Sequence, residues 1–292
     1  MKYTIESKDL VIEVNSQGME LSSIKSNSTD TEYIWQGDPH IWKGQSPVLF
    51  PIIGALKKGF TIINGNKYEM PKHGLVRDSN KPKLIGKTDT SLTFRFSYDQ
   101  ETMLNYPFKF QLDIIFTLQS KTLQVKHIIS NLGEEAMFYS IGAHPAFKCP
   151  LREGEEYQDY YLEFEKKETA STQIVEVNGL IRLDQKPVLS NTHKLQLSKQ
   201  LFDEDALIFK NLKSRKVSLS HKTRGAIVTM KFEDFHYLGI WAKPAAPFVC
   251  IEPWLGIGDP INSNQKFEEK EGILKLDPHQ NESKSYEITI VE

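Results

Sequence analysis

The sequence predicts an all-β protein built as a large antiparallel β-sandwich, and three observations lead to this fold class. Apolar and polar residues alternate from end to end, which is typical of strands with one buried face. Helical periodicity is scarce, and the best helix candidate is SKQLFDEDAL from Ser198, whose hydroxyl can cap a short turn. Turn residues recur at regular spacing between the alternating segments, as they do in antiparallel sandwiches.

The predicted elements follow in chain order. SPVLFPIIGAL, between Lys43 and Lys57, is interpreted as a buried strand and turn. Asn64-Gly65 suits a tight hairpin between TII and KYEM, and Asn131-Leu132-Gly133 separates HIIS from AMFYSI. Five clear alternating strands are LTFRFSY from Leu92, FQLDIIF from Phe110, LQVKHI from Leu123, KVSLS from Lys216 and SYEITIV near the end. No repeat or linker marks a boundary, so residues 1–292 are predicted to form a single domain.

Composition narrows the classes of partner. Lys and Arg total 36 against 38 Asp and Glu, so the net charge of −2 provides no long-range field to attract nucleic acid. Charges interrupt every apolar stretch of MKYTIESKDLVIEV, which disfavours a signal peptide. SPVLFPIIGAL is well short of the ~20 residues that span a bilayer, so no membrane partner is predicted. Cys149 and Cys250 are expected to be reduced core residues of a cytoplasmic protein.

Titratable side chains occur within four apolar or Gly/Pro-rich segments, where a charge is costly unless it has a partner or a task. These segments are MPKHGLVRD, SIGAHPAF, LFDEDALIF and FVCIEPWLGIGD. His144 follows an apolar strand and precedes Pro145, which favours an extended strand end, where a cleft often lies. Glu252 interrupts FVCI and precedes Pro253, so its carboxyl is expected to be at least partly buried. Its alternatives are a functional carboxylate and a buried ion pair with Lys243 or Arg77.

Other candidates are weaker. His73 precedes Gly74, a residue that permits close backbone approach, but an exposed loop histidine is the alternative. Asp205, which faces the ALIF run, is the acidic residue of the Asp203–Asp205 cluster expected to point inward. The four tryptophans, Trp254 among them, can supply platforms for sugar rings or belong to the core. No nucleophile elbow, dinucleotide motif, P-loop or closely spaced histidine pair occurs, so neither a cofactor nor a metal is predicted.

The ordered set of segments resembles the aldose 1-epimerase (galactose mutarotase-like) superfamily, especially its LacX-like bacterial branch. The resemblance covers essentially the whole chain, through NSQGMELSSI, GQSPVLFPIIGALKKG, MPKHGLVRDS, NYPFKF, YSIGAHPAF, LFDEDALIF and VCIEPWLGIGD. Each motif is weak by itself, whereas their order is specific. The resemblance implies the supersandwich fold, with a carbohydrate cleft on one concave sheet.

The resemblance also implies roles for individual residues. Glu252 matches the general base, His144 the general acid, His73 a second cleft histidine and Asp205 a substrate-binding aspartate. The family's cleft arginine has no clear equivalent, because GALKKG places Ala55 near that position with Lys57 and Lys58 following. HGLVRD further resembles the HG-x-x-R pattern of hexose-6-phosphate mutarotases, which gives Arg77 a possible role in binding phosphate.

Three functions remain open. The leading hypothesis is a cofactor-free aldose 1-epimerase that opens a free sugar ring with one base and one acid. A hexose-6-phosphate 1-epimerase is the second, with Arg77 and the pair Lys57 and Lys58 as its anion site. A non-catalytic carbohydrate-binding protein with the same cleft is the third, and the missing arginine keeps it open. The predicted partner is in each case a small-molecule sugar.

Overall fold

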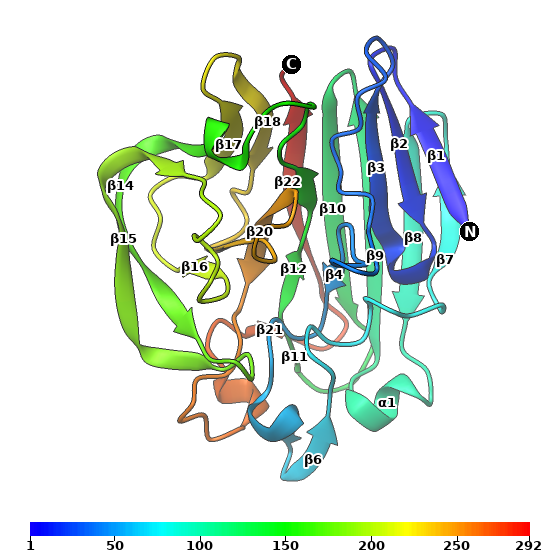
Figure 1. Ribbon diagram of the computed structural model, residues 1–292. Helices are drawn as coiled ribbons and strands as arrows, with labels where there is room; N and C mark the ends of the chain where they lie inside the picture. The colour runs from blue at the N-terminus through cyan, green and yellow to red at the C-terminus, as the bar shows by residue number, and fades with distance from the viewer.

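Strands make up 52% of the chain and helices 5% in the computed structural model, which describes residues 1–292. The helix share is far below the ~30–35% of an average globular protein, and the prediction of an all-β antiparallel fold is confirmed. The main sheet has 15 strands, and its order runs β4-β12-β20-β19-β16-β14-β17-β18-β22-β10-β9-β8-β7. Two of the 15 strands lie off this path, since β13 pairs with β20 and β15 pairs with β14. Figure 1 shows β22, the C-terminal strand, in the middle of this sheet.

The strand bounds follow from these pairings. The main sheet comprises β4 (Val48–Leu49), β7 (Lys83–Lys87), β8 (Ser91–Ser97), β9 (Phe110–Gln119), β10 (Thr122–Asn131), β12 (Ile141–Ala143), β13 (Ala146–Lys148), β14 (Tyr160–Val175), β15 (Ile181–Gln196), β16 (Leu207–Phe209), β17 (Lys216–His221), β18 (Gly225–Lys231), β19 (Tyr237–Trp241), β20 (Phe248–Leu255) and β22 (Asn281–Ile290). Smaller sheets are formed by β1 (Lys2–Glu6), β2 (Leu10–Asn15) and β3 (Glu20–Ser26), by β5 (Phe60–Ile63) and β6 (Asn66–Glu69), and by β11 (Met137–Tyr139) and β21 (Leu274–Leu276).

Helical structure is limited to short turns. The only α-helix is α1 (Thr102–Asn105), and the 3-10 turns are η1 (Gln17–Met19), η2 (Lys57–Gly59), η3 (Tyr157–Asp159) and η4 (Phe267–Glu269). The helix predicted from Ser198 is wrong, because residues 199–204 form consecutive turns and Asp205 a bend that lead into β16. Phe202 is buried in the core, and Asp205 has a left-handed φ of 76°, which a continuing helix does not allow.

The predicted strands and hairpin are otherwise present. The five alternating segments correspond to β8, β9, β10, β17 and β22. In β10 every second residue is buried, as the alternation predicts for a strand with one face on the core. The β5–β6 hairpin turns at Asn64 and Gly65, which both have positive φ, 49° and 79°, as a two-residue hairpin of this kind requires.

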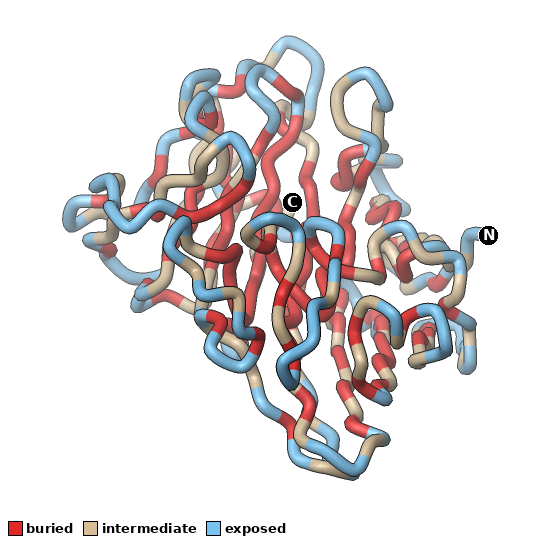
Figure 2. The backbone as a smooth tube through the Cα atoms, turned by 90° about the horizontal axis from the view of Figure 1, so that it is seen from below, coloured by how far each residue is buried: buried red, intermediate tan, exposed pale blue.

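The core is one cluster of 69 buried residues, which Figure 2 shows along the middle of the strands, while exposed segments gather in the loops. A separate cluster of six lies beneath the cleft described below: Leu49, Ile53, Ile181, Ile208, Trp254 and Ile257. The long hairpin of β14 and β15, at the left of Figure 1, contains several register irregularities that let its outer half curve.

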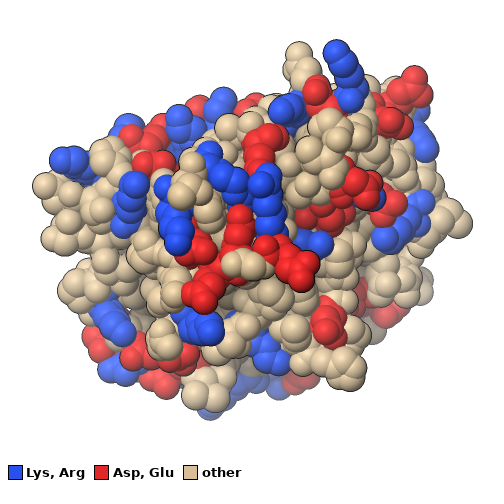
Figure 3. Space-filling model, turned by 45° about the horizontal axis from the view of Figure 1, so that its top comes forward, with Lys and Arg blue, Asp and Glu red and all other residues tan.

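The surface carries charges of both signs. Over the face drawn in Figure 3, lysines and arginines are interspersed with aspartates and glutamates, so no broad field of one sign covers it. None of the helices is long and apolar enough to cross a membrane.

Candidate active site

A cleft of about 1140 Å³ opens against strands β16, β19 and β20 and the inner side of the β14–β15 hairpin. Its volume exceeds the ~300–1,000 Å³ of common small-ligand pockets, so it has room for a sugar and its substituents. Six of the seven site residues predicted from the sequence line it: His73, Arg77, His144, Asp205, Glu252 and Trp254. Residues that are distant in the sequence therefore meet in one cavity.

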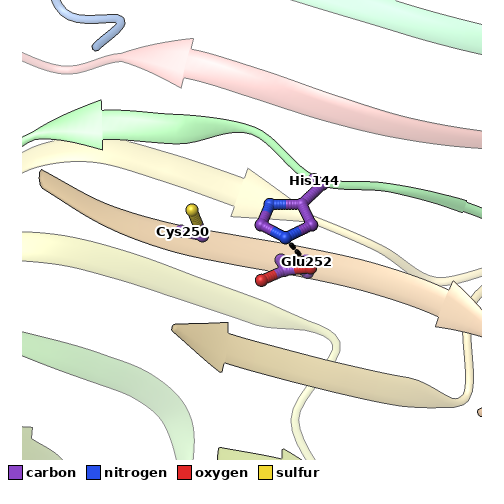
Figure 4. A group of neighbouring side chains, drawn as sticks. All are labelled: His144, Cys250 and Glu252. Atoms are coloured by element: carbon purple, nitrogen blue, oxygen red, sulfur yellow. Dashed lines mark ion pairs between the residues drawn. The ribbon is translucent and has the colours of Figure 1, made fainter. Parts of the chain in front are cut away.

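Glu252 and His144 are placed by neighbouring strands. Glu252 lies in the fully buried strand β20, opposite Gly239 of β19. His144 lies in the connection between β12 and β13, and both of these short strands pair with β20. The connection is fixed because the amide of Ile251 donates to the carbonyl of Pro145 at 3.1 Å. His144 Nε2 thereby lies 3.2 Å from Glu252 Oε2, the contact drawn as a dashed line in Figure 4.

Burial dominates the electrostatics of this pair. Loss of solvent raises the pKa of Glu252 well above its usual value and lowers the pKa of His144 to about 3. Lys72 and Arg77 partly oppose the rise at Glu252, whereas Asp205 adds to it. Burial thus favours an uncharged carboxyl beside an uncharged imidazole.

His73 is the second histidine of the cleft. It is buried with a φ of 70°, and the following Gly74 leaves no room for a side chain, since a Cβ there would lie 2.2 Å from the carbonyl oxygen of Phe50. The amide of Gly54 donates to His73 Nδ1 at 3.2 Å, which leaves Nε2 to carry the proton of the neutral ring. Burial, followed by the repulsion that protonated rings of His73 and His144 would exert on each other, lowers the pKa of His73 well below its usual value. His73 is therefore a neutral hydrogen-bond donor.

Aromatic rings surround His144. Trp42 stacks on it with ring centroids 5.1 Å apart, and Trp241 approaches edge-on at 5.6 Å. Trp254 lies on β20 between two glycines of the neighbouring strands, Gly142 of β12 and Gly239 of β19. A Cβ would lie 2.7 Å from the Trp254 ring at Gly142 and 2.8 Å from it at Gly239, so only glycine leaves room for the ring. Flat apolar surfaces therefore adjoin the titratable pair. Sequence analysis named these tryptophans as platforms but could not tell which would meet the histidine.

Lys57 is the exception among the predicted site residues, because it lies outside the cleft. Its ammonium donates to the carbonyl of Ser263 at 3.0 Å and its amide to Asp259, so it ties two loops together. Lys58, which has a left-handed φ of 57°, is exposed and does not line the cleft either. The predicted anion site at Lys57 and Lys58 is corrected accordingly.

Sequence analysis missed Lys72, which does line the cleft. Gly179, at the tip of the β14–β15 hairpin, has no side chain, and a Cβ there would lie 3.2 Å from the Ala55 side chain and 3.7 Å from Lys72 Nζ. The ammonium of Lys72 thus lies near Ala55, the position at which the family resemblance placed the missing cleft arginine. The available signal was its position directly before His73, but neighbouring residues in a chain do not always face the same cavity.

A set of possible metal ligands adjoins the cleft. His144, Cys250 and Glu252 each offer one ligand atom, and these atoms all lie within 4.8 Å of one another. Cys250 and Glu252 are two residues apart on β20, so their side chains lie on the same face of the sheet (Figure 4). The expectation of no metal site rested on the absence of closely spaced histidines, a criterion that cannot detect ligands from two strands.

The fold places the chain in the class of galactose mutarotase-like β-proteins. The structure of a galactose mutarotase related enzyme from Lactobacillus acidophilus matches with a TM-score of 0.95 and 31% identity, over 100% of this chain and 98% of that one. A galactose mutarotase-like protein from Lactobacillus casei matches with a TM-score of 0.93 and 26% identity, over 99% and 100%.

Sequence comparison gives the family. Protein LacX (plasmid) of Lactococcus lactis subsp. lactis is 37% identical over 299 residues, covering 99% of both chains. The family model described as aldose 1-epimerase matches residues 1–272. The chain therefore belongs to the aldose 1-epimerase family, and the resemblance inferred from its motifs is confirmed.

Proposed function

We propose that this protein is an aldose 1-epimerase, an isomerase that interconverts the α and β anomers of a free sugar. The observation that carries the proposal is the buried contact of 3.2 Å between His144 Nε2 and Glu252 Oε2 in a cleft lined by aromatic rings. Membership of the aldose 1-epimerase family supports a sugar as substrate.

The chemistry needs one base and one acid. Opening a pyranose ring removes the proton of the O1 hydroxyl and delivers a proton to the ring oxygen O5, and both oxygens are bonded to C1. In the proposed mechanism the Glu252 carboxylate accepts the O1 proton while His144 Nε2 donates to O5. The C1–O5 bond breaks and C1 becomes an aldehyde. Rotation about C1–C2 and reversal of both transfers then give the other anomer.

The reactive charge state is reached by moving one proton within the pair. Transfer of that proton from Glu252 to His144 leaves the total charge of the pair at zero, so burial penalises the separation of charge but no net charge. Lys72 and Arg77 lower the pKa of Glu252 and so favour its carboxylate, with Lys72 the stronger of the two, whereas both also lower the pKa of His144 and so oppose its protonation. Hydroxyl groups of a bound sugar would further solvate both charges.

Neighbouring residues are suited to holding the sugar. His73 would donate from Nε2 to a hydroxyl, and the half-buried carboxylate of Asp205 would accept from another. The ring of Trp254 would pack against the apolar C–H face of the sugar. These groups would fix the orientation of C1 relative to Glu252 and His144, which is the main requirement for efficient proton transfer.

The absence of the family's cleft arginine does not leave this region without a cation. Lys72 Nζ approaches the surroundings of Ala55 through the space that Gly179 leaves open. A lysine can supply the positive charge, although without the planar fork of an arginine. The missing arginine is therefore no argument against an enzyme.

A second candidate is a phosphorylated sugar as substrate. Arg182 and Lys186 of the cleft rim form ion pairs with Asp184 and Glu204. Lys72 and Arg77 form no ion pair with any carboxylate of the chain, although Arg77 lies 6.0 Å above the Trp42 ring. Two uncompensated cations beside the catalytic pair favour an anionic group on the sugar.

A panel of sugars tests both candidates. We would measure α–β exchange by NMR for glucose, galactose and their 6-phosphates, with EDTA present, and measure binding on the same samples. The proposal expects exchange well above the uncatalysed rate for at least one sugar. Exchange confined to the 6-phosphates would assign the phosphorylated substrate. Binding without exchange for every sugar bound would favour the carbohydrate-binding protein and overturn the enzyme.

Two further expectations belong to this proposal. Residues 1–292 would act as one domain, because the main core draws on residues from Ile5 to Ile290. A cytoplasmic location would suit Cys149 and Cys250, which are both buried free thiols.

A further inference from the structure

We propose that His144, Cys250 and Glu252 form an inhibitory binding site for a thiophilic divalent cation such as Zn²⁺. One ligand atom from each residue lies within 4.8 Å of the other two. Imidazole nitrogen, thiolate sulfur and carboxylate oxygen are the three donor types that zinc takes in proteins. Figure 4 shows Cys250 and Glu252 projecting from β20 with the His144 ring facing them.

The donors are buried and incompletely satisfied. His144, Cys250 and Glu252 are 8%, 0% and 1% exposed. Glu252 Oε2 and His144 Nδ1 are buried atoms without a hydrogen-bond partner in the chain. Buried polar atoms normally have partners, so Glu252 Oε2 has unused capacity to bind a ligand, and the vacant His144 Nδ1 can hold the ring proton while Nε2 binds the metal.

The geometry requires a small adjustment. Zinc ligands lie about 2.0–2.3 Å from the metal, which places tetrahedral donors roughly 3.3–3.8 Å from one another. The nitrogen and oxygen of His144 and Glu252 are already 3.2 Å apart. The Cys250 sulfur must approach by up to about 1.5 Å, which rotation of the Cys250 and Glu252 side chains can supply. Since His144 and Glu252 line the cleft, the metal would enter from the cleft.

Charge balance favours a doubly charged metal. A thiolate and a carboxylate neutralise Zn²⁺, and a neutral imidazole completes a complex without net charge, which suits a buried position. Binding releases the thiol proton and the proton held by the His144–Glu252 pair, so the apparent affinity should rise with pH. Lys72 and Arg77 repel the incoming cation, while Asp205 attracts it.

The bound metal would occupy the atoms that the sugar chemistry uses. Glu252 could no longer accept the O1 proton and His144 could no longer donate to O5, so the metal would compete with the sugar. This inhibition rests on the proposed function, whereas the binding of the metal does not. Cys250 takes no part in the proton transfers.

Cobalt(II) is the probe of choice, because a thiolate bonded to Co²⁺ gives a near-ultraviolet charge-transfer band. Titration of the full-length protein with CoCl₂ should produce this band, and ZnCl₂ should abolish it. Cys250→Ala should remove the band. It should also weaken zinc binding at least 10–100-fold, because losing a partner that only hydrogen-bonds to a metal ligand already has an effect of that size, and Cys250 would be a ligand itself. Cys149→Ala is the matched control, since Cys149 is also a fully buried free thiol, and it should keep the band.

The outcomes separate the two proposals. Absence of the band in the unmodified protein, or a band that survives in folded Cys250→Ala, overturns the metal site and leaves the proposed function intact. The unmodified protein and the Cys149→Ala variant decide the question even where Cys250→Ala does not fold. A band that depends on Cys250, together with undiminished anomer exchange in the zinc-loaded protein, overturns the catalytic roles of His144 and Glu252.

Discussion

Replacement of Glu252 by Gln separates a catalytic carboxylate from a structural one. Gln keeps the shape of the side chain but removes the basic oxygen that would accept the O1 proton. General acid–base groups contribute about 10²–10⁴-fold, so we expect kcat to fall by at least about 10²-fold, which raises the barrier by roughly 2.7 kcal/mol or more. Sugar affinity should change little, because an amide preserves most of the hydrogen-bonding capacity.

The structure predicts a small effect on stability. Breaking a buried ion pair costs roughly 3–5 kcal/mol when it leaves an uncompensated charge. Burial lowers the pKa of His144 to about 3, so its imidazole remains neutral at pH 7 once Glu252 is replaced. No buried charge is then left behind. We expect the free energy of unfolding to change by about 1 kcal/mol or less, because Glu252 Oε2 has no hydrogen-bond partner in the chain that Gln would lose.

Glu168→Gln is the matched control, because Glu168 is equally buried but lies on β14 outside the cleft. Its carboxylate accepts from the amide of Lys213 and from both the amide and hydroxyl of Ser214. Gln cannot accept all of these, so this variant should lose stability and keep its turnover. Thermal unfolding and anomer exchange would be measured on the same preparations. Near-native exchange in well-folded Glu252→Gln would refute the assignment of Glu252 as base.

Three other perturbations have defined outcomes. Arg77→Met should raise KM at least tenfold for any 6-phosphate that the protein turns over, because it removes a charged hydrogen bond that contributes about 1.5–3 kcal/mol. KM for the parent hexose should change less, and equal effects on both sugars would contradict an anion site. Burial lowers the pKa of His127 to about 4, so between the ordinary histidine pKa of 6.5 and pH 4 the unfolded chain binds a proton there and the folded chain does not. The contribution of His127 to stability is therefore complete above the ordinary histidine pKa of 6.5 and is lost as pH falls toward 4, by roughly 3 kcal/mol in all. Because burial lowers the pKa of His73 and His144 as well, His127→Leu should make the pH dependence of the denaturation midpoint shallower over this window without removing it, and an unchanged pH profile would count against the shift. Lys270→Met would leave Asp259, its buried partner at 2.9 Å, without a counter-charge, and should lower the free energy of unfolding by roughly 3–5 kcal/mol in urea titrations. Lys266→Met at the surface is the control and should lower it by less than about 0.5 kcal/mol.

Strand alternation predicted most of the fold because it records which face of a strand meets the core. β10 is the clearest example, since its buried residues alternate along its whole length. The segment from Ser198 was harder, because its apolar residues fit a helical spacing. Phe202 instead enters the core from a run of turns, and the left-handed backbone at Asp205 stops any helix. Local pattern cannot anticipate such a tertiary contact.

The candidate site was predictable where a polar residue interrupts a buried strand or follows its end. Glu252 and His144 are of this kind, and β20 brings them together through its pairing with β12 and β13. The cationic residues were not predictable in this way. Lys57 is held by Ser263, which is distant in the sequence, while Lys72 lies beside the hairpin tip at Gly179. Long flexible side chains on loops take directions that only the folded chain defines.

The central claim is that Glu252 and His144 act on one sugar as a single acid–base pair, and a double-mutant cycle tests it most directly. Anomer exchange would be measured for the unmodified protein, Glu252→Gln, His144→Asn and the double variant, with a sugar that the unmodified protein turns over. We predict that each single variant loses about 10²-fold or more and that the double variant is no slower than the slower single variant by more than a few-fold, because neither group can work without the other. Losses that multiply in the double variant, or near-native exchange in either folded single variant, would contradict the account.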